Sequence, residues 1–154
     1  MAYTTPKTFA ANDILTASEM NTYVRDNTVA LKAPPSDQYS GELSDGTSSA
    51  TFVDVDATNL SLTITTTGGD VRIGYVGWCD NTFDIFLDVD IDGTRFQNTT
   101  NGIMRNNTTK QNLSFVVVAT GLSAASHTFK LQFKGDGANA NSLVSTNFWV
   151  SESG

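Results

Sequence analysis

The sequence has few of the side chains that carry catalysis and metal binding. Its 154 residues include one cysteine, Cys79, one histidine, His127, and three glutamates. One cysteine cannot form an internal disulfide, and one Cys with one His is too few for the usual tetrahedral zinc set. No G-x-S-x-G nucleophile motif and no glycine loop for nucleotides occurs. We therefore expect neither an enzyme nor a cofactor, and His127 to be a hydrogen-bonded residue at a strand end.

Positive charge is also scarce. Nine Lys and Arg residues stand against sixteen Asp and Glu residues, which gives a net charge of −7. Such a chain repels nucleic-acid phosphates and anionic membrane surfaces, so neither is an expected partner. There is no apolar run long enough for a transmembrane helix, and the N-terminus does not resemble a signal peptide. We expect a soluble protein made in the cytosol.

The first 40 residues differ from the rest and predict an N-terminal arm. Thr16 with Glu19 three residues later forms a capping box, which marks a helix start. The pattern predicts a helix over about 17–31, ended by Pro34-Pro35. Residues 41–154 form the second predicted unit.

The predicted helix has a narrow apolar stripe with coiled-coil spacing and one polar member. The stripe consists of Ala17, Met20, Val24, Asn27 and Leu31. A helix this short is marginal alone and needs a partner surface: its own domain, a second copy, or another subunit. The predicted partner contacts are Met20, Tyr23, Val24, Arg25, Asn27 and Leu31, with Asn27 fixing register.

From residue 41 onward, apolar and polar residues alternate with the period of half-buried strands. The predicted strands cover residues 53–57, 60–64, 71–75, 83–91, 113–119, 129–133 and 148–150, with a short one near 103–104. Turn signals such as Asp92-Gly93 separate them. No helical pattern intervenes, so we predict an all-β fold, an eight-stranded antiparallel jelly-roll β-sandwich.

Residues 84–93, DIFLDVDIDG, place four aspartates on one predicted strand. Asp88, Asp90 and Asp92, followed by glycine, match the opening of an EF-hand calcium loop. Thr99 stands where that loop requires a bidentate carboxylate, and the flanks read as strand. We therefore expect a solvent-exposed strand face, with the three aspartates as alternative metal ligands.

The two tryptophans, Trp78 and Trp149, lie opposite the core-facing row of their predicted strands. An indole in that position can stack on a sugar ring or pack in a subunit interface. Ordinary packing within the domain is the third interpretation.

Two segments resemble known proteins. DILTASEMNTYVRDN, residues 13 to 27, resembles the L-T-A-x-x-[ML]-N-x-[YH]-[VL]-R-D-N segment near the N-termini of many small structural proteins of tailed bacteriophages. ATGLSAASHTFKLQFK, residues 119 to 134, is similar to a strand–turn–strand pattern in their jelly-roll domains. The resemblance covers about a fifth of the chain. It implies a virion component, commonly homotrimeric, with an N-terminal attachment segment and a C-terminal jelly roll.

Composition and resemblance together predict a non-enzymatic virion protein made in the host cytoplasm. Because the chain ends after one sandwich, we expect a homotrimeric capsid decoration (cement) protein whose arm binds the major capsid protein or another virion component. A tail, neck or head-fibre protein that binds a host receptor is the alternative. A carbohydrate-binding jelly-roll module is the third hypothesis, with a host-surface glycan as its partner.

Overall fold

The computed structural model describes residues 4–80, 84–107, 110–136 and 141–153. One continuous helix comes first, with parts α1 (Ala17–Met20), π-helical η1 (Asn21–Asp26) and α2 (Asn27–Lys32). The strands are β1 (Ser36–Thr47), β2 (Val53–Asp54), β3 (Ser61–Thr65), β4 (Asp70–Asp80), β5 (Ile85–Ile91), β6 (Thr94–Arg95), β7 (Met104–Asn106), β8 (Gln111–Ala119), β9 (Ser126–Lys134) and β10 (Asn141–Ser153).

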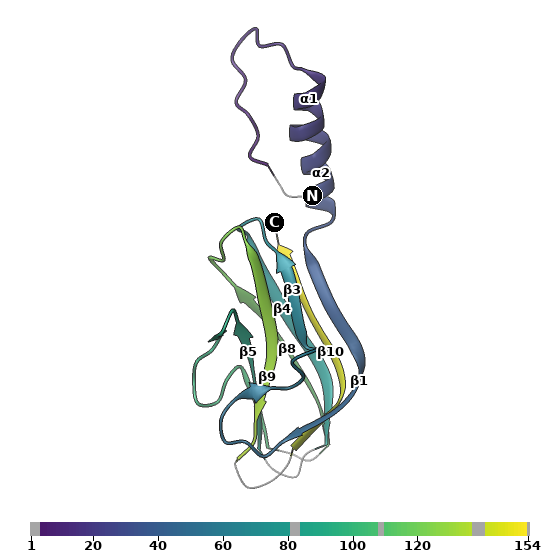
Figure 1. Cartoon of the computed structure of the whole chain (residues 1–154), viewed down its shortest axis with the longest axis vertical. Coiled ribbons are helices and arrows are strands. Elements are labelled where there is room, and N and C mark those ends of the chain that lie inside the picture. Colours follow the sequence, from purple (N-terminus) through teal and green to yellow (C-terminus); the bar gives the residue numbers. More distant parts are fainter. Residues whose placement is uncertain (1–3, 81–83, 108–109, 137–140, 154) are drawn as a thin grey trace.

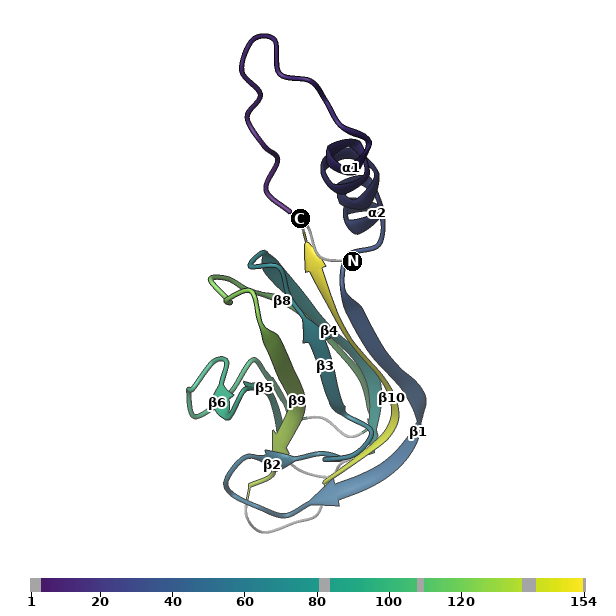
Figure 2. The ribbon, with the colours of Figure 1, turned by 45° about the horizontal axis from the view of Figure 1, so that its top comes forward.

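The strands form two antiparallel sheets packed face to face, so the fold is an all-β sandwich (Figure 1). The four-stranded sheet has the order β1-β10-β4-β8. In the other sheet, β9 lies beside β5; β2 and β3 pair with β9, while β6 and β7 pair with β5. Figure 2 shows the space between the two layers, which the core side chains fill.

Alternate residues of both sheets point into this space, as the period-two pattern predicts. Tyr75 stacks on Phe115 with ring centroids 5.7 Å apart. Burying one large apolar side chain contributes about 1.5–3 kcal/mol, so the core is the main source of stability. The largest fully buried side chains are Tyr75, Phe129, Phe148, Leu60, Ile73, Ile85, Leu87, Leu131, Leu143, Val71, Val89 and Val150.

Strand β1 lies before the first strand that the sequence predicted, at residues 53–57. It begins at Ser36, inside the predicted arm of residues 1–40, and pairs with β10 over most of its length. Among its apolar side chains that the structure describes, Tyr39 and Leu43 pack against the core. Because backbone pairing with a neighbour can hold an edge strand, β1 needs few apolar residues, and the alternation test missed it.

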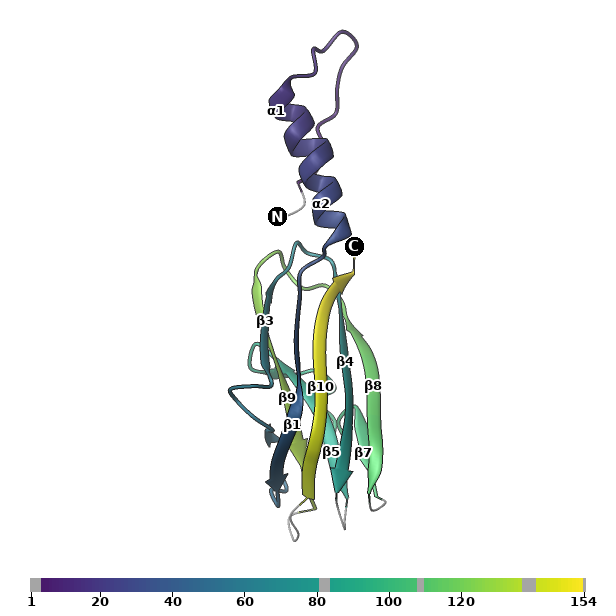
Figure 3. The ribbon, with the colours of Figure 1, turned by 90° about the vertical axis from the view of Figure 1, so that its right-hand side faces the viewer.

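The helix projects from one end of the sandwich, beside the end of β10 (Figures 1 and 3). Its start is the predicted capping box: Thr16 Oγ1 accepts the Glu19 N–H at 3.2 Å, and Glu19 Oε2 accepts the Thr16 N–H at 2.9 Å. In the parts of the chain that the structure describes, no helix could span a membrane.

Candidate functional site

The arm folds back on itself, with the N-terminal segment lying along the helix. Asn27 is buried, and its side chain bonds both backbone groups of Thr4. The Thr4 N–H donates to Asn27 Oδ1 at 2.8 Å, and Asn27 Nδ2 donates to the Thr4 carbonyl at 2.7 Å. The amide that was predicted to fix register between helices is thus engaged within its own chain.

A second contact sets the direction of this segment. Lys7 Nζ lies 2.7 Å from Glu19 Oε1, two helical turns before Asn27, so the segment runs antiparallel to the helix. The hydrogen bond from Lys7, with those from Thr16, lowers the pKa of Glu19 to about 2. Glu19 therefore stays ionised in the pair.

The arm exposes apolar side chains that nothing in the described chain covers. Met20, Val24 and Val29 are 43%, 52% and 45% exposed. Asn27 is the one buried residue among the helical side chains that the structure describes. We call the exposed set the arm apolar surface: Phe9, Ile14, Leu15, Met20, Val24 and Val29.

The other residues that were predicted to contact a partner differ in their exposure. Tyr23 is half-buried, and Arg25 is exposed with its Nε bonded to Asp26 at 2.8 Å. The side chain of Leu31 lies outside the described residues. Partner contact by these residues stays a prediction.

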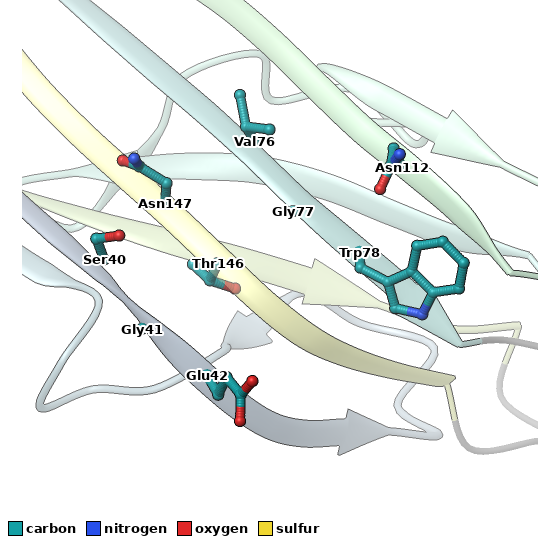
Figure 4. A pocket seen from close by; sticks show the side chains of 9 residues that line it. All are labelled: Ser40, Gly41, Glu42, Val76, Gly77, Trp78, Asn112, Thr146 and Asn147. Atoms are coloured by element: carbon teal, nitrogen blue, oxygen red, sulfur yellow. The ribbon is translucent and has the colours of Figure 1, made fainter.

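A groove of about 400 Å³ crosses the outward face of the four-stranded sheet (Figure 4). Gly41, Thr146 and Gly77 are partners across β1, β10 and β4, and their row faces the core. Only backbone therefore forms the outward surface at this level, between two rows of outward side chains. The groove is lined by Ser40, Gly41, Glu42, Val76, Gly77, Trp78, Asn112, Thr146 and Asn147.

Polar side chains line the groove together with Trp78. Glu42 and Asn112 lie at the same end as Trp78, and Asn147 lies farther along (Figure 4). Within the described ranges, Ser40, Glu42, Asn112 and Asn147 have no side-chain hydrogen bond or ion pair. The groove therefore combines a half-exposed indole with unused donors and acceptors along its length.

The other tryptophan occupies a different environment. The ring of Trp149 covers Gly74 so closely that a side chain there would have no room. Gly74 is also paired with Val116, which is 64% exposed, and Val118 next along that strand face is 45% exposed. Trp149, Val116 and Val118 therefore form an apolar patch, which we call the β8 patch.

The prediction that the aspartates of β5 form a solvent-exposed strand face is wrong. Asp88 is fully buried and Asp90 is 8% exposed. Arg95 lies over Asp88 and donates to Oδ2 from Nη2 at 2.6 Å and from Nε at 3.1 Å, and the Gln97 N–H reaches Oδ1 at 3.2 Å. The chain after β5 turns back through β6 and β7 along its edge and covers the outward face.

The three aspartates do not form a metal site. Asp88 binds Arg95, while Asp90 Oδ1 accepts the Gly93 N–H of the following turn at 2.8 Å. Asp92 Oδ2 lies 2.6 Å from His127 Nδ1 instead. Across the described stretches, no three His, Cys, Asp or Glu side chains are placed to bind one metal ion.

His127 is held between two acceptors, at the start of β9 as predicted. Nδ1 faces the Asp92 carboxylate, and Nε2 lies 3.0 Å from the Ser123 carbonyl. The hydrogen bond to Asp92 and that to Ser123 raise the pKa of His127. Burial raises the pKa of Asp92, but the Thr128 N–H and His127 outweigh it and the net shift is downward.

Comparison of the sequence with protein-family models and with curated proteins finds no match. The features of this chain that bear on function are therefore the arm, the groove and the β8 patch on the four-stranded sheet, and the two segments at residues 13–27 and 119–134. The groove residues other than Trp78 were missed from sequence. Glu42 could be placed at the level of Trp78, across β10, only once β1 was known to be a strand of this sheet.

Proposed function

We propose that this protein is a non-enzymatic structural component of a tailed-bacteriophage virion, a homotrimeric decoration protein attached through its N-terminal arm. The observation that carries the proposal is the projecting arm. It holds the 13–27 segment, and its apolar surface is left uncovered by its own sandwich.

The sheet order supports a jelly-roll fold for the sandwich. Strands β1, β10, β4 and β8 form one sheet, and β3, β9, β5 and β7 follow the matching order in the other. Counting β2 with β3, and β6 with β7, as interrupted strands gives eight. That is the pattern of a double Greek key.

The arm supports attachment because little of its apolar surface is buried within its own chain. Fixing a backbone residue costs about 1–2 kcal/mol, and the arm has little buried apolar surface to offset this. Internal bonds at Thr4 and Lys7 preform its shape. A preformed arm loses less entropy on docking, so its apolar surface can anchor the protein.

The β8 patch supports self-association. Exposed valines on the edge strand of a sheet, with an indole near them, are typical of a subunit contact. Three copies related by a three-fold axis would bury this edge in a closed ring. Light scattering tests this, and Val116→Lys should yield monomers whose sandwich remains folded.

The attachment test uses the full chain and virions stripped of the protein. Val24→Asp, which places charge in the arm apolar surface, should abolish rebinding, and Asn21→Asp on the same helix should not. Unchanged rebinding of Val24→Asp would contradict the proposal. Copy number per virion, measured by quantitative mass spectrometry, separates decoration, with hundreds of copies, from a fibre with a few.

The groove favours a second candidate, a tail, neck or head-fibre protein that binds a host receptor. The arm joins the sandwich at Ser36, and β1 then runs past Glu42 toward the opposite end (Figure 3). An arm-anchored protein would thus hold the Trp78 half of the sheet away from the virion.

A further inference from the structure

We infer that the groove around Trp78 is a binding site for a neutral glycan, with the indole stacked on one sugar ring. The inference goes beyond attachment. It concerns the sandwich alone and holds whether or not the arm binds a capsid.

The indole supplies the apolar half of such a site. Trp78 is 37% exposed, stands at one end of the groove, and is paired across strands with Asn112 (Figure 4). A pyranose has an apolar face of C–H groups that fits the π-face of an indole, while its hydroxyls point outward around the ring. The groove, at about 400 Å³, lies within the usual size range of ligand sites, about 300–1,000 Å³.

The free polar groups supply the other half. Each sugar hydroxyl can donate one hydrogen bond and accept others. The Glu42 carboxylate accepts two or more, and the amides of Asn112 and Asn147 both donate and accept. On the opposite sheet, by contrast, the Asp54 carboxylate is already engaged, with Lys130 Nζ at 3.0 Å and Gln132 Nε2 at 2.9 Å.

The charge of the groove selects a neutral ligand. Among the lining residues that the structure describes, Glu42 is the one charged side chain, and none is Lys or Arg. Sulfate, phosphate or uronate groups would meet an unopposed carboxylate on a chain of net charge −7. Hexoses and N-acetylhexosamines carry no such groups.

Two neighbouring features of the same sheet suit a sugar less well. The β8 patch presents the exposed Val116 and Val118 beside Trp149 and fits a subunit contact. A second hollow is lined by Ser36, Asp37, Gln38, Trp149, Val150 and Ser151. Its carboxylate is already engaged, since Asp37 Oδ2 accepts the Thr63 N–H at 3.0 Å.

The test starts with the full-length protein on an array of neutral oligosaccharides: cello-, malto-, chito- and lacto-series. Polygalacturonate and sulfated oligosaccharides form the anionic arm. The best neutral glycan is then titrated by calorimetry and by tryptophan fluorescence. We expect Trp78→Ala and Glu42→Gln each to weaken binding by roughly tenfold or more.

The controls separate this site from folding and from attachment. Trp78→Phe keeps an aromatic face and should retain most of the affinity, while Arg72→Gln, outward on the same strand, should change nothing. Val24→Asp in the arm should leave glycan binding intact, so failure of attachment and failure of this inference are distinguishable. Light scattering confirms that every variant has the wild-type oligomeric state.

Three results would overturn the inference. One is that no neutral glycan on the array binds, even at millimolar concentration. Another is binding that Trp78→Ala leaves unchanged. The third is an indole of Trp78 that acrylamide cannot quench in the oligomer, which would make the groove a contact between copies of this chain.

Discussion

The substitution Asp88→Ala tests the buried ion pair between Asp88 and Arg95, on the face of β5 that was predicted to be solvent-exposed. The fully buried carboxylate accepts two hydrogen bonds from Arg95 and two from backbone N–H groups, those of Gln97 and Val89. Removing one partner of a buried pair costs about 3–5 kcal/mol, because the other partner and its neighbours are left unsatisfied.

The environment of Arg95 places the expected loss near the lower end of that range. Its side chain is 25% exposed, so water can reach part of the guanidinium. It also donates to the Thr99 carbonyl at 2.7 Å and stacks 3.8 Å from the Phe52 ring centroid. We therefore expect a loss of about 3 kcal/mol in the free energy of unfolding.

Urea unfolding at fixed protein concentration measures this loss, read from the midpoint at constant m. Asp70→Ala, at the exposed start of β4, is the matched control and should stay within about 0.5 kcal/mol of wild type. Arg95→Met should destabilise the fold strongly, because it leaves the buried Asp88 carboxylate without its charged partner. The double change Asp88→Leu with Arg95→Met should recover part of the loss. The reasoning fails if Asp88→Ala behaves like Asp70→Ala.

Three further predictions concern the sandwich. Leu131→Ala, at a fully buried position, should lower the free energy of unfolding by about 2–5 kcal/mol in the same urea assay. Because the pKa of His127 is raised in the folded protein, its ion pair with Asp92 contributes its full share of folding stability below the ordinary histidine pKa of 6.5. That contribution is lost as the pH rises through the pKa of His127 in the folded protein. The lowered pKa of Asp92 makes its share present above 3.8 and lost at more acid pH, so His127→Gln should remove a stability maximum between these limits, seen in melting temperature against pH. Gly74→Val should displace the Trp149 ring and shift its fluorescence, whereas an unchanged spectrum would contradict the packing described.

Local patterns predicted local structure well. The capping box at Thr16 and the helix after it depend on neighbours three or four residues away, so the sequence contains what is needed. The core rows of β4 and β9 follow period-two alternation for the same reason. Both alternation patterns are confirmed.

Features that depend on distant segments could not be predicted in this way. Alternation correctly put Asp88 on the face away from the core, but the cover that Arg95 provides comes from the turn back after β5. Likewise, Asn27 matched a coiled-coil seam, whereas its partner Thr4 is 23 residues away. The groove could be predicted only from the register of β1 against β10, and β1 has too few apolar residues for the sequence to indicate that register.

The place of β10 has a consequence for how the protein is made. This strand, residues Asn141–Ser153, lies between β1 and β4 and pairs with both. During synthesis, β1 therefore has no neighbour in its sheet until the chain has grown from Thr47, where β1 ends, to Asn141, where β10 begins. Pairing of such distant segments is slow, and the waiting edges of β1 and β4 are open to other nascent chains. A ribosome stalled before residue 141 should hold a chain whose four-stranded sheet cannot close, while the pairing of β9 with β5 is already within reach.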